Sequence, residues 1–158
     1  MSGEIRIFRR AGFAWQCPFS RRELEAVLAA MRRACGLDGV SLELTLVDDS
    51  GISRMNADFL GCSGPTNILS FPPGPGTCPG TCPGTCMDGA RGGASLVLSL
   101  DTLERECLLY GQDAAEHTLR LLAHGMAHVS GLDHGPAMDA AQDAAFAAGL
   151  PAAGILPD

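Results

Sequence analysis

Three of the four histidines in this chain of 158 residues stand close together, in the segment 124–134 that reads HGMAHVSGLDH. His124 and His128 are four residues apart, so on a helix both rings project from one face and can bind the same ion. Gly131 can end that helix in a left-handed turn, which brings His134 back toward the other two rings. Three neutral imidazoles leave one coordination position open, an arrangement typical of a catalytic zinc site rather than a structural one.

The residue after the first of these histidines limits which zinc-dependent reactions the site can catalyse. Zinc peptidases with the pattern H-E-x-x-H use the Glu as general base, but Gly125 stands here, so a metallopeptidase is the weaker hypothesis. Asp133 is the nearest carboxylate in the sequence, and we expect it to act either as a base or as a partner that orients a ligand imidazole. His117 lies two turns before His124, too far to be a fourth ligand, and we expect it at the surface or as an outer partner of the site.

The helix that must hold these rings is predicted over about residues 112–129. Apolar residues recur along it at intervals of four and three, which predicts one buried stripe. The stripe consists of Ala115, Leu119, Leu122, Met126 and Val129. His124 and His128 fall on the opposite side, so both are expected to face a cleft or solvent.

Four strands and four further helices are expected around this helix. The strands are predicted over residues 4–8, 40–47, 67–71 and 94–100. The helices are predicted after Ser20, after Asp48, after Asp101 and over residues 136–148. Ser20 and Glu23 form a capping-box pattern at the first of them. The order of elements favours an α+β fold, a mixed sheet of about four strands with helices packed on it and a zincin-like cleft holding three histidines.

A Gly/Pro/Cys-rich segment, residues 72–92, separates the last two strands, which we expect to pair as in a hairpin. A repeat of period four places Cys78, Cys82 and Cys86 in register. Thiolates bind soft metals, but this chain has neither the C-x2-C pairs of zinc sites nor a helix to align its thiols. We therefore predict a flexible insertion, within a single domain over residues 1–148 that is followed by a C-terminal tail over 149–158.

Charge is unevenly distributed along the chain, whose formal net charge is −7. Seven of the eleven Arg residues lie in residues 1–33, beside only three acidic residues. An acidic protein is a poor nucleic-acid binder as a whole. The basic first elements either mark an anionic partner or solvate the outer face of one strand and one helix.

The sequence predicts a cytoplasmic protein. No apolar run is long enough to span a bilayer, and no apolar stretch follows Arg9 and Arg10 as an export signal requires. Seven Cys is an odd number, which argues against a complete disulfide framework and for a reducing compartment.

Two blocks of the sequence resemble the YbeY family of bacterial endoribonucleases, or rRNA maturation factors. The histidine segment is similar to that family's H-G-x-x-H-x-x-G-x-D-H signature. Asn56 and Phe59, followed by PTNILSFP over residues 65–72, are similar to its upstream N-x-x-[YF]-R…P-T-[DN]-V-L-S-F-P block. The resemblance covers roughly residues 40–135.

The resemblance implies a function and a set of site residues. It implies one Zn²⁺ per chain on His124, His128 and His134, and metal-dependent, single-strand-specific RNA cleavage. The implied roles are 16S rRNA 3′-end processing and ribosome quality control, with rRNA and the small ribosomal subunit or its proteins as partners. The implied substrate cleft contains Asn56, Thr66, Asn67, Ser70 and Phe71.

Four positions depart from the family pattern. Leu60 replaces an Arg that follows the aromatic residue, Cys62 and Ser63 replace a Lys and an Asp, and Ser95 replaces another Asp. A cation holds a phosphodiester and stabilises its transition state, so Arg54 or Arg91 is expected to substitute for the missing Arg as a catalytic group. The alternative hypothesis is a ribosome-assembly or RNA-binding factor that keeps the metal and has weak or lost nuclease activity.

Overall fold

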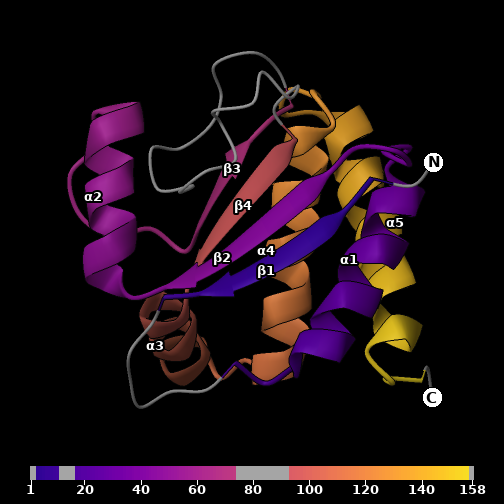
Figure 1. The fold of residues 1–158 in the computed structure, drawn as a ribbon. Coiled ribbons are helices and arrows are strands. Elements are labelled where there is room, and N and C mark those ends of the chain that lie inside the picture. The colour runs from indigo at the N-terminus through magenta and orange to yellow at the C-terminus, as the bar shows by residue number, and fades with distance from the viewer. Residues whose placement is uncertain (1–2, 11–16, 74–92, 157–158) are drawn as a thin grey trace.

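The computed structural model describes residues 3–10, 17–73 and 93–156, which form four strands and five helices (Figure 1). Their order is β1 (Ile5–Arg9), α1 (Arg21–Ala34), β2 (Leu42–Val47), α2 (Asp49–Leu60), β3 (Ile68–Phe71), β4 (Ala94–Ser99), α3 (Leu100–Tyr110), α4 (Ala114–Val129) and α5 (Pro136–Ala152). The three repeated cysteines and Arg91 lie outside the described residues, as does most of the predicted insertion over 72–92.

The strands form one mixed sheet in the order β1-β2-β4-β3. The first three are parallel, with Leu44 of β2 opposite Leu96 of β4. The edge strand β3 runs antiparallel to β4, with Ile68 opposite Leu98. The prediction of an α+β fold with a mixed four-stranded sheet is therefore confirmed, including the antiparallel pair on either side of the predicted insertion.

Helices cover the two faces of the sheet unequally. The main core lies between the sheet and α1, α4 and α5, and it buries Leu44, Leu96 and Leu98 completely. Figure 1 shows α4 crossing behind the sheet with α1 and α5 beside it. A smaller cluster on the opposite face joins α2 to the sheet through Ile52 and Val97. Within the described ranges, no helix is long and apolar enough to cross a membrane.

Side-chain caps fix where the helices begin. The predicted capping box of Ser20 and Glu23 is present at α1. The Asp48 carboxylate accepts a hydrogen bond from the Gly51 amide at 2.7 Å and starts α2. Asp113 caps α4, so this helix begins two residues later than predicted. Ser99, not Asp101, caps α3, because its Oγ accepts from the amide of the third helical residue.

The last helix continues beyond its predicted end at residue 148, as far as Ala152. Gly149 is buried, and its backbone lies so close to α1 that an added Cβ would be 2.6 Å from the terminal methyl of Met31. Leu150 packs against the main core. This burial outweighs the helix-breaking tendency of Gly and of Pro151, which lies in the final turn.

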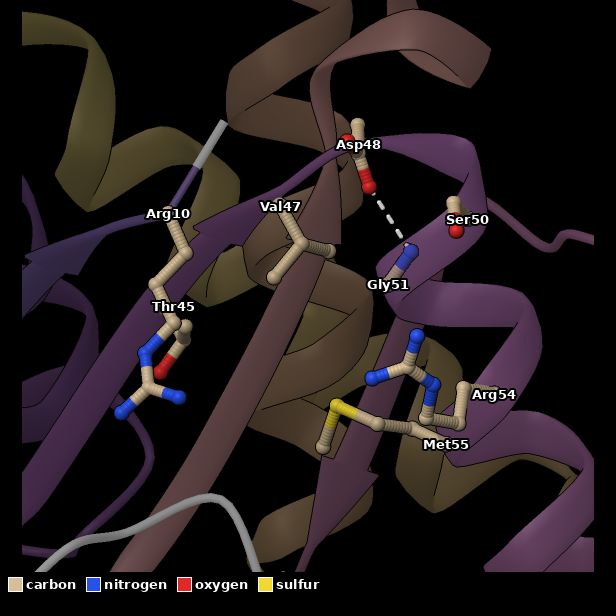
Figure 2. Close-up of a pocket in the computed structure, with 8 residues that line it drawn as sticks. All are labelled: Arg10, Thr45, Val47, Asp48, Ser50, Gly51, Arg54 and Met55. Atoms are coloured by element: carbon tan, nitrogen blue, oxygen red, sulfur yellow. Dashed lines mark hydrogen bonds between the residues drawn. The ribbon is translucent and has the colours of Figure 1, made fainter. Parts of the chain in front are cut away.

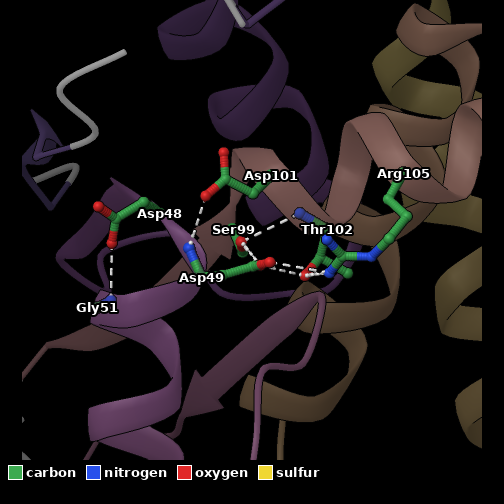
Figure 3. A network of polar contacts seen from close by, with 7 residues as sticks. All are labelled: Asp48, Asp49, Gly51, Ser99, Asp101, Thr102 and Arg105. Atoms are coloured by element: carbon green, nitrogen blue, oxygen red, sulfur yellow. Dashed lines mark hydrogen bonds and ion pairs between the residues drawn. The ribbon is translucent and has the colours of Figure 1, made fainter. Parts of the chain in front are cut away.

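A polar network joins the starts of α2 and α3 (Figure 3). One carboxylate oxygen of Asp49 accepts hydrogen bonds from Ser99 Oγ at 2.9 Å and Thr102 Oγ1 at 2.6 Å, and the other pairs with Arg105 at 2.9 Å. The Asp49 amide donates to Asp101 at 2.9 Å. Partial burial alone would raise the pKa of Asp49, but these hydrogen bonds outweigh it and lower the pKa. The network fixes α2 against the rest of the molecule.

Candidate metal centre

The C-terminal end of α4 positions the three clustered histidines. The helix is capped at Ser130, and Gly131 follows with a φ of +85°. This left-handed turn, which was predicted from the sequence, reverses the chain so that His134 returns beside α4. His124 and His128 are half-buried on the helix, whereas His134 is exposed.

The three imidazole rings gather at one place. The ring centroids of His124 and His128 are 4.5 Å apart, those of His128 and His134 are 5.0 Å apart, and those of His124 and His134 are 6.3 Å apart. The Nε2 atoms of His124 and His128 face each other at 3.0 Å. The chain thus brings together the three residues that its sequence singles out.

The hydrogen bonds of His124 show which of its nitrogens is free to bind. Its Nδ1 lies 3.0 Å from Oε1 of Gln142 on α5. A carbonyl oxygen only accepts, so Nδ1 carries the proton and Nε2 keeps its lone pair. The Nε2–H of His128 then donates to that lone pair. An outer partner that fixes the tautomer in this way is characteristic of histidines that bind metals.

Imidazole nitrogens are among the ligands that zinc binds in proteins. Two nitrogens that bind one tetrahedral zinc ion at about 2.1 Å lie about 3.4 Å apart, so the observed 3.0 Å between the Nε2 atoms needs only a small opening. As the side chains stand, no group of three His, Cys, Asp or Glu in the described part of the chain meets the spacing of a metal site. Ligation by all three histidines therefore stays a prediction.

The electrostatic environment favours the neutral form of His128. Partial burial lowers the pKa of His128, and the neighbouring His124 and His134 lower it further, because two imidazolium ions repel each other. Neutral imidazole is the form that binds metal ions.

Gly125 is buried between α4 and the sheet. An added Cβ would lie 2.9 Å from side-chain carbons of both Ile68 and Leu96, and 3.1 Å from the Ser70 hydroxyl. The helix can approach the sheet this closely only without a side chain at this position. A Glu base cannot occupy it, which is a structural reason against the peptidase hypothesis.

Asp133 is exposed and makes no hydrogen bond or ion pair with any residue that the structure describes. Gln142, not Asp133, is the residue that orients the ring of His124. The sequence did not predict this role for Gln142. The available signal was weak, because Gln142 is a single amide within an Ala-rich helix and lies eight residues beyond the histidine segment.

His117 is not a surface residue. Its Nε2 lies 2.9 Å from Oε2 of Glu106, and their side chains are only 13% and 19% exposed. The amide of Asn67 donates to the same carboxylate at 3.0 Å, and its carbonyl accepts from the Ile68 amide. These bonds join α3, α4 and the start of β3, and they occupy the side chain of Asn67, a predicted cleft residue.

The other predicted cleft residues have different surroundings. Asn56 is buried and donates to the Gly64 carbonyl at 3.1 Å, so it shapes the loop between α2 and β3. Ser70 lies beside the turn of α4 that carries the first histidine. Phe71 contacts Phe59 edge-on, with ring centroids 5.4 Å apart. Thr66 is half-buried.

Two of the positions that depart from the family pattern, Leu60 and Ser95, lie on α2 and on the sheet face that α2 covers. Leu60 ends α2 and is 58% exposed. Ser95 is buried on β4, and its register partner on β2 is Glu43. Paired residues point to the same face, so a carboxylate stands one strand away from the position where the family pattern has Asp. Arg54 lines a separate pocket that includes none of the histidines.

The fold and the sequence have known counterparts. The solution structure of TM1509, a Thermotoga maritima protein, matches with a TM-score of 0.59, over 93% of this chain and 89% of that one. At 19% identity this likeness defines the class of fold, an α+β domain with a mixed sheet.

Sequence comparison identifies the family. A protein of Nitratidesulfovibrio vulgaris named Endoribonuclease YbeY is 47% identical over 149 residues, which are 87% of this chain and 89% of that protein. One of the same name in Oleidesulfovibrio alaskensis is 41% identical over 85% of this chain and 86% of its own length. The profile of the family described as Endoribonuclease YbeY matches residues 19–145. The chain belongs to the YbeY endoribonuclease family.

Proposed function

We propose that this protein is a zinc-dependent endoribonuclease that cleaves single-stranded RNA. His124, His128 and His134 hold one zinc ion per chain. The observation that carries the proposal is the gathering of their rings at the end of α4, in a chain of this family. A zinc ion held by these three histidines would supply Lewis acidity, which lowers the pKa of a bound water or ribose hydroxyl and polarises a phosphate oxygen.

Other residues of the chain have separate tasks in this proposal. Gln142 holds His124 in the tautomer that leaves Nε2 free. Ser70 offers a hydroxyl beside α4. The edge-to-face pair of Phe59 and Phe71 gives an unpaired base a surface for stacking, because Phe59 is 43% exposed. A base within a duplex has no free face for such a contact, which accounts for a preference for single strands.

We further propose that the RNA is ribosomal. Maturation of the 16S rRNA 3′ end and ribosome quality control in the cytoplasm, with rRNA and the small subunit as partners, are the roles that the family resemblance supports. Because the net charge is negative, the protein attracts RNA poorly by itself, which favours recruitment to the RNA through a ribosomal partner.

The test is cleavage of end-labelled RNA by purified protein. We expect cleavage of a single-stranded substrate, much slower cleavage of the same strand in a duplex, and loss of activity in His124→Ala. Asp139→Asn is the matched control, because Asp139 is an exposed acidic residue of α5 whose side chain has no partner among the described residues. Equal activity of the wild type and His124→Ala would overturn the proposal.

Leu60 supports a second candidate function, an assembly factor with weak or lost nuclease activity. A leucine at the exposed end of α2 supplies no charge for a phosphate. If the wild type binds RNA without cleaving it and Leu60→Arg gains cleavage, the second candidate is correct. Fast cleavage by the wild type excludes it.

A further inference from the structure

A pocket of about 280 Å³ lies on the sheet face opposite the main core, between β2 and α2 (Figure 2). Its lining consists of Arg10, Thr45, Val47, Asp48, Ser50, Gly51, Arg54 and Met55. None of the three histidines belongs to it, so it is separate from the candidate metal centre.

Two arginines from different elements define the pocket. Arg54 extends from α2 and makes no hydrogen bond or ion pair with any residue that the structure describes. Arg10 follows β1, and its amide donates to the Leu46 carbonyl at 2.7 Å, which holds its backbone beside β2. Figure 2 shows the two guanidinium groups on opposite sides of the pocket, with Val47 and Met55 between them.

The charge of the lining favours an anion. Asp48 is its single acidic residue, and its carboxylate already caps α2 by accepting from the Gly51 amide. The lining thus carries two guanidinium groups and one carboxylate, and Arg54 has no partner among the described residues, in a chain whose net charge is −7. The planar donors of guanidinium match the oxygens of a phosphate group.

The size and the apolar residues indicate what else the ligand carries. The volume is close to the lower limit of small-molecule pockets, about 300 Å³. Val47 and Met55 supply an apolar floor, and Thr45 adds a hydroxyl beside it. A single phosphate ion would leave much of this space unused, whereas one nucleotide has both an anionic and a flat apolar part.

We propose that this pocket binds one nucleotide, with its phosphate between Arg10 and Arg54 and its base or ribose against Val47 and Met55. The ligand is one unit of a single-stranded RNA, and this part rests on the proposed function. The pocket then supplies a cation for the RNA backbone in a protein that has Leu60 in place of the family's Arg. A free nucleotide shares the same chemistry, and the experiment separates the two sources.

The experiment measures binding of a fluorescent 2′-O-methyl RNA oligonucleotide, which resists cleavage, by anisotropy over a range of salt concentrations. We expect Arg54→Gln and Arg10→Gln each to weaken binding about tenfold at low salt, the size of a lost charge-assisted hydrogen bond. Each should reduce the slope of log K against log salt by about 0.7, the value for one phosphate of a single strand. Thermal unfolding checks that the variants remain folded.

Arg22→Gln is the matched control, because Arg22 is exposed on α1, forms no ion pair with a described residue and changes the net charge equally. It should keep the wild-type affinity. If Arg54→Gln binds the oligonucleotide and adenosine 5′-monophosphate as tightly as Arg22→Gln does, the pocket is not a nucleotide site.

Calorimetry with adenosine 5′-monophosphate distinguishes the two sources. Loss of nucleotide binding in Arg54→Gln with unchanged RNA affinity supports the pocket as a site for free nucleotides and overturns its use for RNA. A wild type that binds the oligonucleotide through Arg54 but cleaves no RNA contradicts the proposed function and supports the pocket. Normal RNA cleavage with unaltered affinity of Arg54→Gln for both probes contradicts the pocket alone.

Discussion

At the scale of single residues, the contact between Gln142 and His124 makes a testable difference to metal binding. Gln142→Ala removes the acceptor that fixes the ring and its tautomer, and loss of such a partner typically costs 10–100-fold in metal affinity. We expect about that loss in a zinc competition titration with a coloured chelator. Gln112→Ala, an exposed amide before α4, is the control. Equal zinc affinity of both variants would show that Gln142 does not orient a ligand.

The sequence was informative at the residue scale where the partners are neighbours in the chain. The spacing of His124, His128 and Gly131 predicted that the three rings gather, because one helix and one turn determine it. Gln142 and Glu106 were not predicted, because their contacts join different helices and leave no local pattern. Asp133 was favoured for its nearness in sequence, but its side chain is exposed.

At the scale of elements, the close approach of α4 to the sheet depends on Gly125. Gly125→Ala forces a methyl group against three side chains at once, all from β3 or β4. Overpacking of this kind costs about 1–3 kcal/mol, and the gain in helix propensity offsets about 1 kcal/mol of it. We expect a net loss of up to about 2 kcal/mol in the free energy of unfolding, measured with urea.

Gly149→Ala is the matched control, a buried helical glycine whose closest neighbour is the terminal methyl of one flexible Met. We expect it to be tolerated better than Gly125→Ala. The opposite order of stabilities would contradict this account of helix and sheet packing.

The network around Asp49 predicts a pH dependence of stability. The pKa of Asp49 is lowered in the folded protein, so its contribution is fully present above the unfolded value of 3.8 and is lost as the pH falls through the folded value. Asp49→Asn should therefore destabilise the protein at neutral pH, and the difference should shrink below pH 3.8. Urea unfolding at both pH values measures it. Asp133→Asn should show neither effect, and a difference for Asp49→Asn that does not change with pH would disprove the prediction.

Element boundaries were predicted well where a side chain caps its own helix, as Ser20 and Asp48 do. They were missed where tertiary packing decides. Packing against α1 carries α5 to Ala152, although Gly149 and Pro151 signal an end. Ser99 was assigned to a strand, and it serves both as the last strand residue and as the cap of α3.

At the scale of the whole molecule, the net charge of −7 predicts how RNA binding responds to salt. The negative electrostatic potential of the protein as a whole repels RNA, and only local clusters of arginine attract it. We expect weak binding by the isolated protein that falls with rising salt, with a slope of about −0.7 for each phosphate contacted. Anisotropy over a potassium chloride series measures the slope. Tight binding that does not depend on salt would contradict this view of the charge.

The fold class was predictable because alternating strands and capped helices follow one another in a recognisable order. The strand order β1-β2-β4-β3 was not predicted, because pairing between distant strands leaves no local signal. The pocket of Arg10 and Arg54 was missed for the same reason, since these two residues, 44 positions apart in the sequence, line one pocket only in the folded chain.

The proposed ribonuclease activity depends on one zinc ion held by three histidines. The most direct test removes metal with a chelator and titrates zinc back while cleavage of single-stranded RNA is followed. We expect no cleavage by the metal-free protein, and a rise in cleavage that ends at one zinc ion per chain and is absent in His124→Ala. Full cleavage by the metal-free protein, or equal zinc-dependent cleavage by His124→Ala, would contradict it.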